Sequence, residues 1–195
     1  MSKVIGICGP IGSGKSLAAA LLKEMGAAII DADALARQIL EPGQPAYAEI
    51  RAAFGGDYIL PDGGVDRKKL GKLIFADEAA RKRLNAITHP HIHEQAALLI
   101  SRYREDSYAM IVLEAALLLE NEGFWDLLDE IWLVTAAPEH IHARLAARDG
   151  LTSAEASARL AAQMPAEQQA KLADHVIINN GSIEELREKL YVYCF

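Results

Sequence analysis

A run of eight residues near the start of the chain has the types and spacing of a phosphate-binding loop. Gly9 and Gly14 are separated by four residues and followed by Lys15 and Ser16, and the apolar stretch 4–8 precedes them. Glycines let a backbone wrap closely and point successive N–H groups inward, which makes a nest for an anion. The helix expected after the loop adds the positive end of its dipole. The pattern matches the Walker A motif completely and predicts binding of nucleotide phosphates.

Two side chains of this loop have chemistry of their own. Lys15 can neutralise charge on the β- and γ-phosphates, and the hydroxyl of Ser16 can ligate Mg²⁺. A glycine-rich turn that binds nothing is the alternative, and the strand before the loop and the helix after it argue against that alternative. We therefore expect the phosphates to lie against Gly9, Pro10, Ile11, Gly12, Ser13, Gly14, Lys15, Ser16 and Leu17.

Two acidic residues, Asp31 and Asp33, follow the second apolar run of the chain. Ligands of a doubly wound sheet bind beyond the carboxyl ends of its strands, so we expect both carboxylates near the phosphate loop. Phosphoryl transfer to a hydroxyl needs a carboxylate that orients the nucleophile and accepts its proton. Capping of the next helix is the alternative role for both acids.

Short apolar runs that alternate with helical patterns predict the frame for these residues. The strand candidates are 4–8, 27–30, 109–113, 131–134 and 176–178. The alternation predicts an α/β fold of the P-loop NTPase type, with a five-stranded, mainly parallel sheet between two helical layers. Helix starts are expected at Pro90, Pro138, Thr152 and Ser182, the first of them opening a helix that reaches about residue 104.

The uneven spacing of the strand candidates predicts two additions to this core. The stretch 32–108 is far longer than the ~12 residues that a crossover between parallel strands requires. We expect a nucleotide-binding core of residues 1–40, 108–148 and 172–195, a helical substrate-binding domain at 41–107, and a lid at 149–171.

Composition limits the classes of partner. A net charge of −7 argues against nucleic acid, although local basic residues can still bind a phosphorylated small molecule. The apolar runs are too short to span a bilayer and no signal peptide is evident, so we expect a cytoplasmic protein. Cys8 and Cys194 have the spacing of neither a metal site nor a disulfide framework.

A longer series of residues, in order along nearly the whole chain, resembles the dephospho-CoA kinase family. The matching residues are 9–16, Ile30 to Asp33 with Ala36-Arg37, 62–70 with Ile74-Phe75, Leu84-Asn85, His89-Pro90, Leu117 to Glu120, Arg144, Arg148-Asp149 and Asn179 to Gly181. Such a series is much more specific than the Walker A motif alone. Four positions depart from the family pattern without removing a group that the chemistry needs: Pro10, Leu17, Ala116 and Leu119.

The resemblance implies transfer of the γ-phosphate of ATP to the ribose 3′-hydroxyl of dephospho-CoA, with Mg²⁺, to give coenzyme A and ADP. It implies Asp33 as the base, with Lys15 and Arg144 stabilising phosphate charge. Further contacts to ATP are implied at Arg148, Asn179, Asn180 and Gly181. Contacts to the acceptor are implied at Asp31, Asp33, Arg67, His89, Leu118 and Glu120. The implied partners are these two small molecules, with no nucleic acid and no membrane, and the chain is expected as a monomer or small homo-oligomer.

Structural roles remain open for several of these residues. Arg144 and Arg148 are four residues apart and could form a solvated helix face, and residues 179–181 could be a turn before the next helix. His89 could orient a helix, and Glu120 could be a surface acid. Two other functions also remain: a nucleoside or nucleotide kinase of the same class, and a non-catalytic nucleotide switch. The Asn-Lys-x-Asp motif that a GTPase switch would use for base recognition is absent from the sequence.

Overall fold

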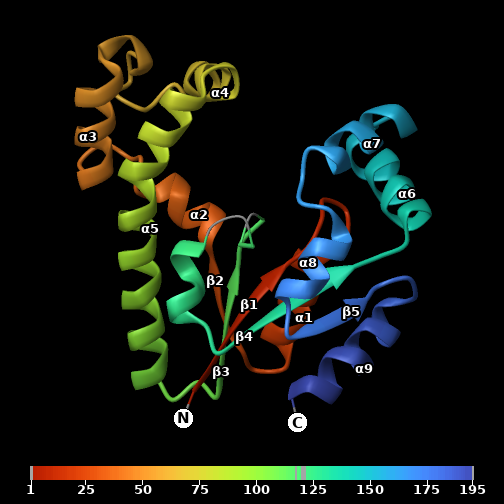
Figure 1. Ribbon diagram of the computed structural model, residues 1–195. Coiled ribbons are helices and arrows are strands. Elements are labelled where there is room, and N and C mark those ends of the chain that lie inside the picture. The colour runs from red at the N-terminus through yellow and green to blue at the C-terminus, as the bar shows by residue number, and fades with distance from the viewer. Residues whose placement is uncertain (1, 117, 120–121, 195) are drawn as a thin grey trace. The chain divides into compact units, whose positions relative to one another are not determined.

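The computed structural model describes residues 2–116, 118–119 and 122–194, and Figure 1 draws it. The chain forms two compact units, one of Met1–Asp31 with Ile100–Phe195 and one of Ala32–Leu99. The three-part division expected from the sequence, with its separate lid, remains a prediction.

A five-stranded parallel sheet forms the centre of the first unit, as the sequence predicted. Its strands are β1 (Lys3–Cys8), β2 (Ala28–Asp31), β3 (Met110–Glu114), β4 (Glu130–Thr135) and β5 (His175–Ile178). They lie side by side in the order β2-β3-β1-β4-β5, so the chain reverses its direction of progress across the sheet next to β1. A ligand of such a sheet binds at this switch point, which is where β1 runs into the phosphate loop.

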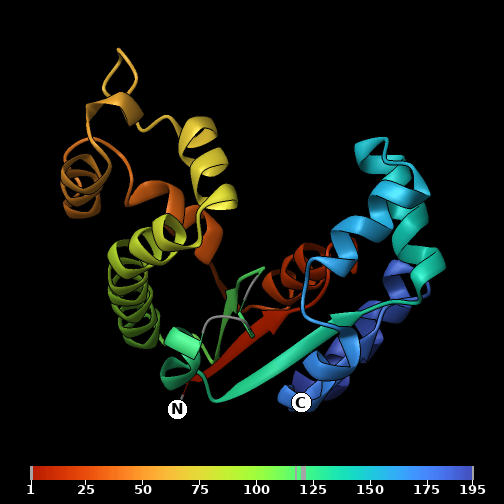
Figure 2. The same cartoon turned by 45° about the horizontal axis from the view of Figure 1, so that its top comes forward.

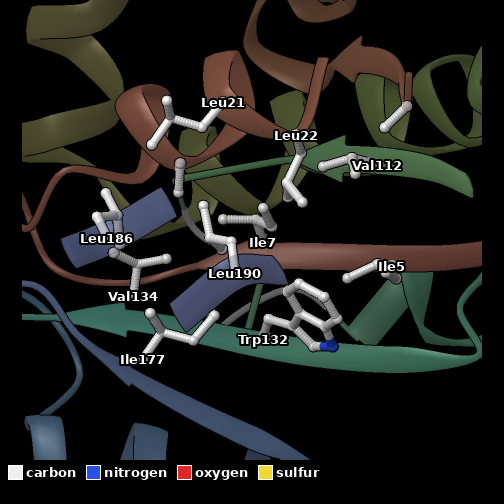
Figure 3. Packing of buried hydrophobic residues seen from close by; sticks show 12 residues of the cluster. Ile5, Ile7, Leu21, Leu22, Val112, Trp132, Val134, Ile177, Leu186 and Leu190 are labelled. Carbon is white, nitrogen blue, oxygen red and sulfur yellow. The ribbon is translucent and has the colours of Figure 1, made fainter. Parts of the chain in front are cut away.

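One face of this sheet packs against α1 (Lys15–Glu24) and α9 (Ile183–Cys194), which lie on the same side of the strands in Figure 2. Side chains of alternate strand residues point to this face and meet leucines of the two helices, as Figure 3 shows. The labelled members of this buried cluster are Ile5, Ile7, Leu21, Leu22, Val112, Trp132, Val134, Ile177, Leu186 and Leu190. Each such side chain contributes roughly 1.5–3 kcal/mol by burial, so the face anchors the strand and the helix that flank the loop.

The opposite face of β1 is packed without room for a side chain at Gly6. A Cβ atom there would lie 2.6 Å from methyl carbons of Leu118 and of Leu128. Leu118 is fully buried, and Trp125 Nε1, in the 3₁₀ helix η2 (Glu122–Leu127), donates to its carbonyl oxygen at 3.2 Å. The segment after β3 therefore rests directly on the central strand.

Three further helices of this unit follow β4: α6 (Pro138–Asp149), α7 (Ser153–Ala161) and α8 (Ala166–Leu172). The expected helix starts at Pro138 and Thr152 are confirmed, and Thr152 forms a complete capping box with Glu155. Helices α6 and α7 share a small apolar cluster of Ala136, Ile141, Leu145 and Ala156, against which Ile11 and Leu160 pack. This cluster joins the segment 149–171 to the phosphate loop.

The second unit is helical and has a core of its own. Its elements are α2 (Ala32–Gln38), α3 (Pro45–Phe54), the 3₁₀ helix η1 (Gly56–Tyr58), α4 (Arg67–Ala76) and most of α5 (Glu78–Glu105). Ile50, Val65 and Leu70 are buried at its centre. Asp66 caps α4, since its carboxylate accepts from the backbone N–H of Lys69 at 2.9 Å.

The expected helix start at Pro90 is wrong, because Pro90 lies inside α5. The start is instead fixed by Asp77, whose Oδ1 accepts from the N–H groups of Ala79 and Ala80 at 2.8 and 3.1 Å. A proline within a helix removes one backbone hydrogen bond and crowds the preceding turn. Nearby, the hydroxyl of Thr88 donates to the carbonyl oxygen of Leu84 at 3.0 Å.

Within the described ranges, none of the helices has both the length and the apolar composition required to cross a bilayer.

Candidate active site

Two glycines give the phosphate loop a shape that other residues could not adopt. Gly9 has φ 145°, and a Cβ atom there would lie 2.0 Å from the carbonyl oxygen of Val134. Gly14 has φ 100°, and its Cβ would lie 2.2 Å from Nδ2 of Asn179. At both positions, a positive φ and the close approach of another atom exclude a side chain. The loop is therefore held against the ends of β4 and β5.

Lys15 holds its ammonium group against the start of the loop. Its Nζ donates to the carbonyl oxygens of Gly9 at 2.7 Å and of Pro10 at 3.3 Å. Lys15 is also the first residue of α1, whose leading N–H groups have no partner within the helix. Backbone donors, the helix dipole and the ammonium thus combine as an anion would require.

Glu114 belongs to the site and was missed from the sequence. It is the last residue of β3, and its Oε1 accepts from the Ser16 hydroxyl at 2.7 Å. It also pairs in register with Asp31 of β2, so two carboxylates lie next to each other at the carboxyl edge of the sheet. The rule that drew attention to Asp31 applies equally to the end of the next strand. The apolar run that marked this strand stops at Leu113, one residue too early.

The hydroxyl of Ser16 and the carboxylate of Glu114 suit a hard cation such as Mg²⁺, which prefers oxygen ligands. Among the residues that the structure describes, no cluster of three or more His, Cys, Asp or Glu could hold a metal. Mg²⁺ usually keeps several waters and takes substrate phosphates as ligands, so few protein ligands are needed. The residues present therefore fit a nucleotide-bound Mg²⁺.

Arg144 and Asn179 clamp the loop from the side of α6 and β5. The Nη1 of Arg144 donates to the carbonyl oxygens of Ser13 at 3.1 Å and Gly12 at 3.4 Å, and Nη2 donates to that of Asn179 at 2.8 Å. Nδ2 of Asn179, a buried residue, donates to the Ser13 carbonyl at 2.8 Å. Arg144 is thus not on a solvated face, and its expected contact with phosphate remains a prediction.

A cavity of about 620 Å³ opens beside the loop, within the range of small-molecule sites. Besides Gly12 and the residues from Gly14 to Leu17, its wall includes Arg144, Arg148, Asn179 and Gly181. Four of the expected ATP contacts therefore share one cavity with the loop. Asn180 is not among its lining residues, and its Oδ1 accepts from the N–H of Ala137 at 2.8 Å.

One of the two arginines that line this cavity, Arg148, forms an ion pair with an acidic neighbour. The exposed Arg148 guanidinium forms two hydrogen bonds to Asp149, at 2.8 and 2.9 Å. This pairing raises the pKa of Arg148 and lowers the pKa of Asp149. Cys8, at the end of β1, is buried, and burial raises the pKa of its thiol to about 12 although Lys15 acts in the opposite direction. Cys8 is therefore a neutral thiol at physiological pH and no nucleophile.

Gln163 is a second loop partner that the sequence reasoning missed. It lies in the turn between α7 and α8, and its Oε1 accepts from the backbone N–H of Ile11 at 2.9 Å. No motif marks it, and 152 positions separate the two residues along the chain. Sequence order alone carries no signal for such a contact.

Half of the six residues expected to contact the acceptor are in the second unit, namely Asp33, Arg67 and His89. Asp31 ends β2 and is exposed, and Asp33 follows in the first turn of α2, also exposed. Arg67 begins α4, and its Nη2 donates to the carbonyl oxygen of Arg37 at 2.8 Å. His89 is half-buried in α5, and burial lowers its pKa.

The roles of these residues stay predictions. The same holds for Leu118, which is fully buried against Gly6 in the first unit. Glu120 lies outside the described residues.

Comparison with known proteins places the chain in a family. The family model described as dephospho-CoA kinase matches residues 3–185. A dephospho-CoA kinase of Geobacter sulfurreducens is 49% identical over 187 residues, covering 96% of this chain and 94% of the relative. The solved structure of dephospho-CoA kinase from Campylobacter jejuni matches with a TM-score of 0.71 and 25% identity, covering 99% of this chain and 96% of that one.

More distant matches show the fold alone. A shikimate kinase structure from Bacteroides thetaiotaomicron has a TM-score of 0.53 at 15% identity, covering 98% of this chain and 97% of that one. The P-loop kinase fold expected from the sequence is thereby confirmed. With a family model that spans most of its length and a relative of nearly half-identical sequence, the chain belongs to the dephospho-CoA kinase family.

Proposed function

We propose that this chain transfers the γ-phosphate of ATP to the ribose 3′-hydroxyl of dephospho-CoA, giving coenzyme A and ADP. The observation that carries the proposal is the family match over residues 3–185, which includes the phosphate loop with Lys15 and Ser16. The hydrogen bond from Ser16 to Glu114 at the end of β3 supports it. The loop amides and Lys15 bind the phosphate chain and neutralise the charge that develops on it.

On the acceptor side, the carboxylate of Asp33 orients the 3′-hydroxyl and accepts its proton as the oxygen attacks the γ-phosphorus. The bond from that phosphorus to the β,γ-bridging oxygen breaks, and ADP leaves with the electron pair. Its position just after the carboxyl end of β2 supports this role for Asp33. The helical second unit is the proposed acceptor-binding domain, with Arg67 and His89 among its contacts.

Mg²⁺ is proposed as the metal, with the Ser16 hydroxyl as a direct ligand and Glu114 orienting that hydroxyl or a water of the ion. When bound, the ion neutralises charge on the β- and γ-oxygens. Arg148 reaches ATP from the wall of the cavity, after exchanging Asp149 for a phosphate oxygen.

A substrate panel tests the proposal. Release of ADP is measured in a coupled assay with dephospho-CoA, nucleosides and nucleoside monophosphates as acceptors. We expect turnover with dephospho-CoA and little with the others. Preference for a nucleoside or its monophosphate would instead favour a nucleotide kinase, and absence of turnover with dephospho-CoA would refute the proposal.

The Lys15→Ala variant is the negative control for this panel. The substitution removes the ammonium that neutralises phosphate charge, so both ATP affinity and rate should fall. Full activity of that variant would show that the measured turnover does not come from this loop.

The proposal also includes a location in the cytoplasm and a monomer or small homo-oligomer, without nucleic-acid or membrane partners. Cell fractionation would test the location, and light scattering would test the oligomeric state.

A further inference from the structure

One peptide group of the phosphate loop is held from both of its ends. The carbonyl oxygen of Pro10 accepts from Lys15 Nζ at 3.3 Å, and the N–H of Ile11 donates to Gln163 Oε1 at 2.9 Å. These two polar atoms belong to the same planar peptide, in which C=O and N–H point in opposite directions. Lys15 and Gln163 therefore fix the plane of this peptide from opposite sides.

Gln163 is itself held in place. Nε2 of Gln169, a buried residue of α8, donates to the carbonyl oxygen of Met164 at 2.7 Å, which braces the turn that carries Gln163. On the other side of the turn, Leu160 of α7 packs in the same apolar cluster as Ile11. The hydrogen bond from Ile11 thus joins two braced segments and is not a passing contact of a mobile surface side chain.

We propose that Gln163 is a positioning residue for phosphoryl transfer, which acts through the Pro10–Ile11 peptide on the ammonium of Lys15. The inference rests on the proposed function for its catalytic meaning. Hydrogen bonds in a chain polarise one another. When Gln163 accepts from the N–H of Ile11, the carbonyl oxygen of Pro10 in the same peptide becomes a better acceptor for Lys15. Without an acceptor, the half-buried N–H loses its partner and the peptide is free to rotate, which takes one anchor away from Lys15.

Gln163 also lies within the segment 149–171. Through this bond, the seating of that segment on the loop is coupled to the placement of the lysine. The coupling needs only the carbonyl oxygen of the glutamine side chain, because that atom makes the contact with Ile11. This requirement separates a positioning role from direct donation of the side-chain amide to phosphate.

Two substitutions distinguish these roles. Gln163→Met keeps the length and packing of the side chain and removes the acceptor, whereas Gln163→Glu keeps an oxygen that can accept from Ile11. We expect the methionine variant to lose about 5- to 10-fold in kcat and in affinity for a non-hydrolysable ATP analogue, the effect of roughly one hydrogen bond. The glutamate variant should stay within about 3-fold of wild type on the same scale.

The exposed Gln168 provides the control, since Gln168→Glu makes the same charge change on α8, five residues further along the chain. Near-wild-type kcat and analogue affinity in Gln163→Met would overturn the proposal. Equal losses in Gln163→Met and Gln163→Glu, with Gln168→Glu unaffected, would also overturn it, in favour of direct donation to phosphate. Circular dichroism and Tm confirm that each variant is folded.

A double-mutant cycle tests the dependence on Lys15. Affinity for the ATP analogue is measured by equilibrium dialysis for wild type, Gln163→Met, Lys15→Ala and the double variant. If Gln163 acts through Lys15, its replacement should have no effect beyond about 2-fold once the ammonium is absent. An equal loss in both backgrounds would overturn the proposal. This measurement needs no acceptor, so it stands apart from the turnover of dephospho-CoA by the wild-type protein, which tests the proposed function.

Discussion

At the scale of single residues, the site depends on a few oxygen and nitrogen atoms whose neighbours decide what they can do. The Ser16 hydroxyl would be an ordinary helix-start group without Glu114 2.7 Å away. A carboxylate that accepts from a metal-binding hydroxyl makes that oxygen a better ligand and fixes its direction. Loss of the Glu114 carboxylate should therefore weaken binding of the metal more than binding of the nucleotide.

Replacement of Glu114 by Gln tests this role. An amide oxygen can still accept from Ser16, but the negative charge is lost, so we expect the Mg²⁺ concentration for half-maximal rate to rise by ~10-fold or more. Titration of activity with Mg²⁺ measures it, with the exposed Glu139→Gln of α6 as the matched control. An unchanged Mg²⁺ requirement would remove Glu114 from the proposed metal site.

Asp33 is the residue whose loss should stop chemistry while leaving binding intact. Asp33→Asn retains the size and polarity of the side chain but cannot accept the hydroxyl proton, so turnover should fall by ~10²-fold or more with ATP affinity preserved. Single-turnover kinetics and calorimetry separate these two quantities. Asp31→Asn, two residues earlier, is the comparison variant. Near-normal turnover of Asp33→Asn would exclude Asp33 as the base.

At the scale of elements, the loop is shaped by what lies behind it. Gly14 combines a φ of 100° with the close approach of Asn179, so an added Cβ meets both backbone strain and an amide that already holds Ser13. Both effects displace the backbone N–H groups that bind phosphate. The loop and the residues after β5 are therefore one structural unit, although they lie at opposite ends of the sequence.

Gly14→Ala should lower ATP affinity by ~10-fold or more and the free energy of unfolding by about 1–3 kcal/mol, as expected for a strained backbone position. Gly26→Ala is a close control, because Gly26 has φ 97° with no atom within 4 Å of the added Cβ. It isolates the cost of strain from that of the clash. Equal ATP affinities of the two variants would mean that Asn179 does not shape the site.

Local signals predicted most elements, because they act over a few residues. Apolar runs identified all five strands of the sheet. The helix start at Thr152 and the acid at the end of the second strand, Asp31, were also found from their neighbours in sequence. Pro90 misled because Asp77 provides a stronger start, and the preference of proline for a first turn does not forbid a place inside a long helix. Gln163 could not be found, since its partner Ile11 is brought near only by the folded chain.

At the scale of the whole molecule, each of the two units has an apolar core that is formed by its own residues. The first is centred on the sheet with Trp132 and Leu22, and the second on Ile50, Val65 and Leu70. Separate cores mean that damage to one unit should affect one substrate more than the other, if donor and acceptor binding are divided as proposed.

Ile50→Ala tests this division. Ile50 is fully buried, so its truncation should cost about 2–5 kcal/mol of unfolding free energy. Turnover of dephospho-CoA should fall while ATP affinity stays within about 2-fold, since the phosphate loop belongs to the other unit. Denaturant unfolding and calorimetry measure the two effects, with Leu22→Ala on the buried face of α1 as the opposite case. A large loss of ATP affinity in Ile50→Ala would contradict independent units.

The place of β1 in the middle of the sheet also determines when the protein can become functional during its synthesis. Of the strands of this sheet, β1 is made first, yet it pairs with β3 and β4, with Lys3 opposite Met110 and Ile5 opposite Glu130. Contacts between residues so distant in sequence form slowly, because a long loop must close first. The nascent chain therefore carries an unpaired apolar strand until β3 and β4 have left the ribosome. Chaperones would recognise such a strand. The phosphate-binding loop is therefore synthesised before β3 and β4, but it can bind nucleotide only after these strands have paired with β1.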